Sequence, residues 1–231
     1  MKRDALVLVI GDFFDAMQGP RDPRGTPADV DPAHLTPAYF NGIVSDAASF
    51  LAPYARNIAL LSKGNHEISV IKHYGVSLLD MLARELTRVE PSSPVQIGGY
   101  EGWVRIMVRI YTVRTQLKWY YHHGAGAGAM MSFGTLNIRR KASYLPDCDA
   151  YISGHTHDQY VLPIARLRLS NQGIQHRDVM WAVRTPGFKD ERSADSWAVQ
   201  KDHPPKPIGG VWGIVTATAR SVRTTFVADV V

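Results

Sequence analysis

Four short apolar runs in this chain each end in a loop motif rich in glycine, aspartate, asparagine or histidine. The motifs are GDFFD at residues 11–15, GNHE at 64–67, HHG at 122–124 and GHTHD at 154–158. Each preceding run has the length and composition of a buried or half-buried β-strand. Ligand sites in α/β sheets lie outside the carboxyl ends of strands, so we expect the four motifs to converge on one site.

The segments between the motifs predict helices first and strands later. Helices are predicted over residues 36–54, where Thr-Pro opens the segment, over 75–88, where apolar residues recur at helical spacing, and over 131–145. Further strands are predicted over 102–112, 160–170, 174–185 and twice within 209–231. The 231 residues therefore predict one α/β domain, spanning 1–231, with two packed sheets flanked by helices.

Charge and cysteine content narrow the class of protein. The formal net charge of +5 is compatible with phosphate-bearing substrates, but it is too small to indicate nucleic-acid binding by itself. The single cysteine, Cys148, rules out an intramolecular disulfide and fits a reducing compartment. The sequence has no recognisable signal peptide and no membrane-length apolar stretch, so we expect a cytoplasmic protein that does not associate with membranes.

The residue types in the four motifs indicate metal chemistry. Aspartate, asparagine and histidine without thiolates suit divalent ions such as Mn²⁺, Fe²⁺ or Zn²⁺. Asp12 has two carboxylate oxygens and can bridge two ions, while His155 and His157 project to the same side of an extended segment. Taken singly, each motif also has an ordinary explanation as a turn or a hydrogen-bonded loop. Their joint occurrence at strand ends favours a metal site.

The order of these motifs resembles the successive signature motifs of the calcineurin-like metallophosphoesterase superfamily. The later stretches WAVRTPGFKDE and PPKPIGGVW are similar to the carboxyl-terminal part of its phage and bacterial members. The resemblance implies a four-layer α/β/β/α sandwich of two mixed sheets, with a two-metal centre at the strand ends. It assigns five residues of this chain as metal ligands: Asp12, Asn65, His123, His155 and His157.

The resemblance also distributes roles among these residues. Asp12 matches the bridging carboxylate, Asn65 and His155 match ligands of the second ion, and His157 matches a ligand of the first ion. His123 is chosen from the histidine doublet because it directly precedes the glycine, with His122 as the alternative.

One further histidine is assigned a catalytic role by the resemblance. His66 matches the histidine that contacts the substrate phosphate and protonates the leaving group without binding metal. Asp15 is expected to hold the loop after Asp12 rather than to bind an ion.

One family motif has no counterpart here. The family usually begins with Asp-x-His at the end of an earlier strand, where both residues bind the first ion. We expect the chain to start one strand and one helix late, with impaired activity; the alternative is a true variant with only the second metal site. In either case the first ion keeps only Asp12 and His157 from this chain.

The sequence thus predicts a metal-dependent phosphoesterase that hydrolyses phosphomonoesters or phosphodiesters with a metal-activated water. Mn²⁺ is the expected ion, with two ions in a complete member and one here. A nuclease of the DNA-repair type is the first alternative, with Arg105 and Arg109 or the basic cluster at 139–141 contacting phosphates. A non-catalytic, partner-binding scaffold is the second. The substrate and oligomeric state remain open.

Overall fold

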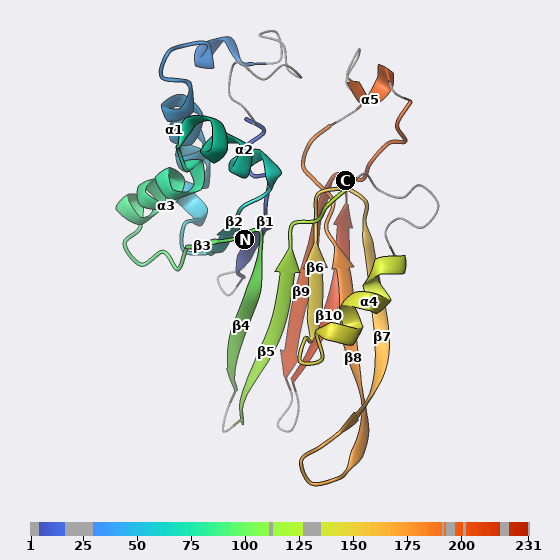
Figure 1. The fold of residues 1–231 in the computed structure, drawn as a ribbon. Helices are drawn as coiled ribbons and strands as arrows, with labels where there is room; N and C mark the ends of the chain where they lie inside the picture. The colour runs from blue at the N-terminus through green and yellow to red at the C-terminus, as the bar shows by residue number, and fades with distance from the viewer. Residues whose placement is uncertain are drawn as a thin grey trace. The chain divides into compact units, whose positions relative to one another are not determined.

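The computed structural model describes residues 5–16, 30–110, 113–126, 135–190, 192, 197–200, 202–217 and 222–230. The chain divides into two compact units, Met1–Glu101 and Gly102–Val231 (Figure 1). Both units combine helices and strands, which confirms the predicted α/β class. The four-layer order and the single domain over 1–231 stay predictions. No helix in the described ranges is long and apolar enough to cross a membrane.

The first unit contains a three-stranded parallel sheet in the order β1-β2-β3. Its elements are β1 (Val7–Ile10), the 3₁₀ helix η3 (Pro32–His34), α1 (Tyr39–Leu51), η4 (Ala52–Tyr54), β2 (Ile58–Ser62), α2 (Asn65–Tyr74), α3 (Leu78–Val89) and β3 (Gln96–Gly98). In β1 and β2, Ile10 lies opposite Ser62. The loops that carry Asp12 and Gly64 therefore leave the same edge of the sheet.

The core of the first unit is built on the apolar face of α3. Leu79, Leu82 and Leu86 of this helix are fully buried and pack with Val44 of α1 and Leu61 of β2. Ser77 caps the amino end of the helix, and its hydroxyl accepts a hydrogen bond from the Asp80 backbone N–H. This arrangement confirms the helix predicted over 75–88 and fixes β2, whose end carries the GNHE motif.

Two helices of the first unit differ from the sequence prediction. Helix α1 begins at Tyr39 rather than directly after Thr36. Helix α2 was not predicted, because GNHE was interpreted as a loop and the helix buries only Glu67 and Val70. A helix with so few buried side chains has a weak apolar periodicity. Its end is nonetheless marked by Gly75, which has a φ of 68° in the left-handed region.

The second unit contains a five-stranded mixed sheet in the order β4-β5-β6-β8-β7 and a two-stranded sheet of β9 and β10. Its elements are β4 (Glu101–Ile110), β5 (Val113–His122), α4 (Leu136–Tyr144), β6 (Ala150–Ser153), β7 (Tyr160–Leu169), β8 (Gln175–Arg184), α5 (Trp197–Gln200), β9 (Gly209–Ala217) and β10 (Val222–Val230). β7 and β8 form the predicted hairpin. β5 and β6 are parallel, with His122 opposite Ser153.

The two faces of the five-stranded sheet carry different elements of the second unit (Figure 1). On one face Lys141 of α4 lies over the ring of Tyr151, with Nζ 5.6 Å from its centroid. On the other face Phe226 of β10 packs between Trp119 and Trp181 at 5.3 and 5.9 Å between ring centroids. Trp119 is therefore a core residue, as expected of the tryptophans, whereas Trp103 is 50% exposed on a sheet face.

Candidate metal-binding half-sites

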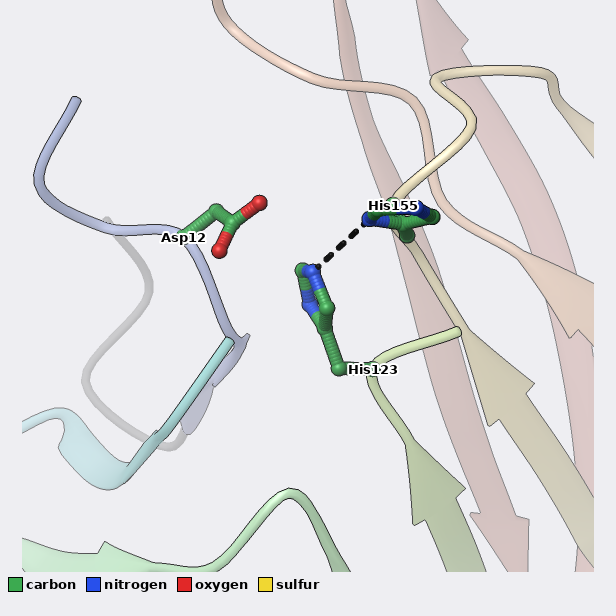
Figure 2. A group of neighbouring side chains, drawn as sticks. All are labelled: Asp12, His123 and His155. Atoms are coloured by element: carbon green, nitrogen blue, oxygen red, sulfur yellow. Dashed lines mark hydrogen bonds between the residues drawn. The ribbon is translucent and has the colours of Figure 1, made fainter. Parts of the chain in front are cut away.

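Asp12 follows β1 after one glycine and is held in a strained conformation. Its φ is 52°, in the left-handed region that residues other than glycine rarely adopt. Its Oδ1 accepts a hydrogen bond from the His66 backbone N–H at 3.0 Å, in the first turn of α2. Because the amino end of a helix carries partial positive charge, this contact stabilises the ionised carboxylate. Figure 2 shows Asp12 in the loop that follows β1.

Glu67 ties the two strand-end loops of the first unit together. This carboxylate is 2% exposed and accepts hydrogen bonds from the backbone N–H groups of Asp12 at 3.0 Å, Phe14 at 3.0 Å and Gly64 at 2.8 Å. Both of its oxygens are thus used by the backbone. No role is predicted for Glu67 from the sequence, although an acid at the third position of a helix is a recognised signal of helix capping.

Gly64 is required by the close approach of the same two loops. A Cβ at this position would lie well inside van der Waals contact of Asp12 Oδ1 and 2.5 Å from the Asp12 backbone nitrogen. No side chain fits between these groups without moving Asp12. Asn65, a predicted ligand, is the first residue of α2 and so begins at the same strand end. Its role as a ligand stays a prediction.

His66 lies among carboxylates. Its Nδ1 is 3.1 Å from Asp15 Oδ1, and its Nε2 is 3.7 Å from Asp12 Oδ2. Burial opposes protonation of this ring, but the contact with Asp15 and the charges of Asp12 and Glu67 outweigh burial and raise the pKa of His66 above its ordinary value. A histidine whose pKa is raised keeps its proton to a higher pH than an ordinary histidine does, which suits a proton donor.

In the second unit, His123 and His155 face each other from the ends of β5 and β6. Their Nε2 and Nδ1 atoms are 3.2 Å apart, the contact drawn as a dashed line in Figure 2. His123 is 1% exposed. The two loops can approach this closely because residue 124 is glycine. A Cβ at Gly124, whose φ is 123°, would lie only 2.7 Å from His155 Cβ. Two strand-end histidines from separate motifs therefore form one pair, in which His123 is buried and His155 is half-buried.

The two histidines of the doublet, His122 and His123, contact different groups. His122 Nδ1 accepts a hydrogen bond from the Gly124 backbone N–H at 2.9 Å, so this ring helps to hold the turn. The His123 ring points instead to His155, with ring centroids 5.0 Å apart. This difference favours the choice of His123 over His122 as the ligand.

His157 lies near residues from the carboxyl-terminal part of the chain. Its imidazole packs against Gly187, where a Cβ would be 3.3 Å from His157 Cδ2. The next residue, Asp158, is buried and forms an ion pair with Lys206. The loop that carries His157 is thus bound to segments from the carboxyl-terminal part of the chain. Its predicted role as a ligand of a first ion stays a prediction.

Arg184 supports the same loop from β8. Its Nη1 donates to Thr156 Oγ1 at 2.8 Å and its Nε to Ser153 Oγ at 3.3 Å. Its guanidinium also lies over the Tyr160 ring, 5.3 Å from the centroid. Sequence reasoning gave this arginine no role. A planar side chain with several donors can hold two separate hydroxyl groups at once, which fixes the segment between His155 and His157.

Backbone strain coincides with the predicted ligands. In the described residues other than glycine, positive φ occurs at Asp12 (52°), His155 (72°), His157 (55°) and Asp202 (52°). Three of these four are ligands assigned from the sequence. Such conformations cost about 1–3 kcal/mol each and persist where the surrounding structure imposes them, commonly at functional sites. The strain thus points to the same residues as the motifs.

Comparisons with known proteins add little to this geometry. The chain matches no protein-family model and no curated protein. Among solved structures it is similar to wild-type Vps29 of Entamoeba histolytica complexed with Zn²⁺, at 12% identity and a TM-score of 0.26, over 63% of this chain and 74% of that one. At this TM-score the likeness carries no argument, and the case for a site rests on the residues themselves.

Proposed function

We propose that this chain binds a divalent metal ion through Asp12, His123 and His155 and hydrolyses a phosphate ester at that ion. The observation that carries the proposal is the His123–His155 pair, whose facing nitrogens are 3.2 Å apart. Each of the three residues offers one ligand atom. One carboxylate and two imidazoles make a donor set suited to Zn²⁺, Fe²⁺ or Mn²⁺.

The spacing of the two imidazoles fits a shared ion. Two nitrogens bound to one tetrahedral ion at about 2.05 Å lie about 3.3 Å apart. The distance of 3.2 Å between His123 Nε2 and His155 Nδ1 is close to that value. The same distance also permits one neutral imidazole to donate to the other, so metal titration is needed to distinguish the two states.

Asn65 is the fourth ligand that we assign to this ion. It starts α2 at the strand end that also positions Asp12 through Glu67. With Asn65, the set equals the second-ion ligands expected from the resemblance to calcineurin-like metallophosphoesterases. His157 belongs to the other ion in that scheme.

The remaining residues supply proton transfer and positioning. When bound, a divalent ion lowers the pKa of water and offsets negative charge on a phosphoryl group. His66 is our candidate for the proton donor to the leaving oxygen, since its pKa is raised above the ordinary value. Asp15 holds the His66 ring at 3.1 Å, and Glu67 holds the loop of Asp12.

The proposal is tested by measuring Mn²⁺ binding and hydrolysis on the same set of variants. Replacements Asp12→Asn, His123→Ala and His155→Ala are compared with His73→Ala, an exposed histidine on α2. Loss of a direct ligand is expected to weaken Mn²⁺ binding by more than the 10–100-fold that is typical of residues behind the ligands. Hydrolysis of a chromogenic phosphomonoester and phosphodiester is expected to fall with it, while His73→Ala behaves like wild type.

The outcomes separate the alternatives. Unchanged Mn²⁺ binding in His155→Ala would contradict the proposed ligand set and leave the histidine pair as a hydrogen bond within the fold. If Mn²⁺ binding requires Asp12, His123 and His155 but no hydrolysis is detected, the non-catalytic scaffold would be favoured. Hydrolysis of the diester but not the monoester would favour the nuclease class.

A further inference from the structure

The outer face of β4 and β5 carries an unusual set of exposed side chains in the second unit. Along both strands, residues alternate between this face and an inner face that contains Trp119 and other buried side chains. We name the outer set the β4–β5 basic face; it consists of Trp103, Arg105, Met107, Arg109, Arg114, Gln116, Lys118 and Tyr120. Four of these eight residues are cationic, and the acid Glu101 at the start of β4 follows the same alternation.

One end of the β4–β5 basic face presents a fixed aromatic ring. Trp103 is 50% exposed, yet its ring packs edge-on against Tyr120 with 5.1 Å between centroids and 73° between planes. Tyr120 is in turn stacked with Tyr151, 6.3 Å between centroids. Trp103 is therefore positioned by neighbours while much of its surface stays open. An exposed, pre-positioned indole is a suitable platform for stacking a planar ligand.

A pocket adjoins this ring. Its volume is about 280 Å³, and its lining residues are Trp103, Val104, Arg105, Lys118 and Asp147. The pocket thus combines an aromatic surface with two cations and one carboxylate. Asp147 Oδ1 lies 3.8 Å from Lys118 Nζ and 3.7 Å from Arg168 Nη2, so two cations offset its charge. The carboxylate remains able to accept a hydrogen bond from an amino group.

Three of the four cations of the face are available to a ligand, whereas the fourth, Lys118, pairs with Asp147. In the described part of the chain, no carboxylate forms an ion pair with Arg105, Arg109 or Arg114, and all three are exposed. Clustered cations of one sign raise the local concentration of anions. Because they line two adjacent strands, the anion that suits them is an extended chain of negative charges rather than a single small ion.

We propose that the β4–β5 basic face binds single-stranded nucleic acid, with a base stacked on Trp103 and phosphates contacted by Arg105, Arg109 and Lys118. Proteins that bind single strands without sequence preference combine a basic groove with aromatic stacking platforms. A single strand is favoured over a duplex because only unstacked bases can lie on the indole. A membrane surface is disfavoured because Trp103 and Met107, the exposed apolar residues of the face, are separated by Arg105.

The inference does not depend on the proposed hydrolysis. Binding to this face needs no metal, and all of its residues belong to the second unit. It does extend that proposal, because β5 runs from Lys118 through Tyr120 to His122, and His123 follows directly. A strand bound along the face is thereby directed toward the strand end that carries one of the candidate ligands.

The test is fluorescence anisotropy of a labelled oligothymidylate measured in EDTA, which separates binding from hydrolysis. Trp103→Ala is expected to weaken binding at least about fivefold, because stacking one base contributes about 1–3 kcal/mol. Trp103→Phe keeps a stacking surface and is expected to restore most of the affinity. Trp212→Ala is the matched control, since Trp212 is 49% exposed on β9.

Charge variants test the phosphate contacts. The double variant Arg105→Gln, Lys118→Gln is expected to bind the oligonucleotide more weakly. The slope of log affinity against log salt concentration should also become smaller by about 1.4, since each lost phosphate contact on a single strand contributes about 0.7. Two exposed cations elsewhere in the unit, Arg177 and Arg223, changed together to Gln, control for net charge. Equal losses in both double variants, or wild-type binding by Trp103→Ala, would overturn the inference. Trp103-dependent binding to anionic vesicles but not to the oligonucleotide would also overturn it.

Discussion

At the scale of single residues, Glu67 is the side chain that holds the loops of Asp12 and Gly64 in place. Its buried carboxylate accepts three backbone N–H groups from the loops after β1 and β2. Glu67→Gln replaces one acceptor oxygen with a donor that faces these N–H groups. Hydrogen bonds to charged groups contribute about 1.5–3 kcal/mol, so we expect a loss of roughly 2–3 kcal/mol in the free energy of unfolding, measured with urea.

A matched variant distinguishes this role from a general effect of removing an acid. Glu85 on α3 has a side chain that is 41% exposed and pairs with Arg88, and Glu85→Gln is expected to change stability by at most about 1 kcal/mol. Glu67→Gln is also expected to weaken Mn²⁺ binding because Asp12 is no longer held, whereas Glu85→Gln leaves it unchanged. Equal stability of the two variants would show that the Glu67 hydrogen bonds contribute little.

The protonation of His66 is a second residue-scale property that can be measured. Burial lowers the pKa of its ring, but Asp15, Asp12 and Glu67 together raise it above the ordinary value. Asp15→Asn removes the nearest of these carboxylates, which contacts the ring at 3.1 Å. The pKa of His66 is expected to fall in this variant, as followed by proton NMR in EDTA with His66→Ala to assign the resonance.

The same shift predicts the pH dependence of stability. A histidine whose folded pKa is raised stabilises the fold fully below its unfolded pKa of about 6.5, and this contribution is lost as pH rises through the folded pKa. The stability difference between wild type and Asp15→Asn should therefore be larger at acidic than at alkaline pH. An identical pKa of His66 in both proteins would exclude Asp15 as its partner.

At the scale of elements, the sequence predicted strands and strand-end motifs well because burial leaves a strong pattern. The apolar runs before Asp12 and His155 are the strands β1 and β6, and the alternation over 102–112 marks β4. These patterns depend on which side chains meet the core, and that information lies within each segment. The histidine pair followed from the same logic, since parallel strands bring their ends to one edge.

The elements that the sequence did not reveal are those fixed by polar contacts between distant segments. Helix α2 buries few apolar side chains, and its start is set by Gly64 against Asp12 and by the Glu67 hydrogen bonds. Arg184 reaches Thr156 from another strand. Such partners are separated by up to 55 residues, so no local periodicity records them. The strained φ of Asp12 has the same origin.

At the scale of the whole molecule, the ion that we propose would make the folding of the two units depend on each other. Asp12 belongs to the unit Met1–Glu101, whereas His123 and His155 belong to Gly102–Val231. An ion that binds residues of both units stabilises each only while the other is folded. At a free concentration of 100 times Kd, such binding adds about 2.7 kcal/mol to the free energy of unfolding.

Calorimetry with and without Mn²⁺ tests this dependence. Mn²⁺ is expected to raise the unfolding temperature of the second unit in the wild-type chain. Asp12→Asn should abolish that rise although Asp12 lies in the first unit, while Asp80→Asn, an exposed acid on α3, should keep it. If Mn²⁺ stabilised the second unit equally in Asp12→Asn, the two histidines would bind the ion without the carboxylate. The metal centre would then belong to the second unit alone, and Asp12 would act only within its own loop.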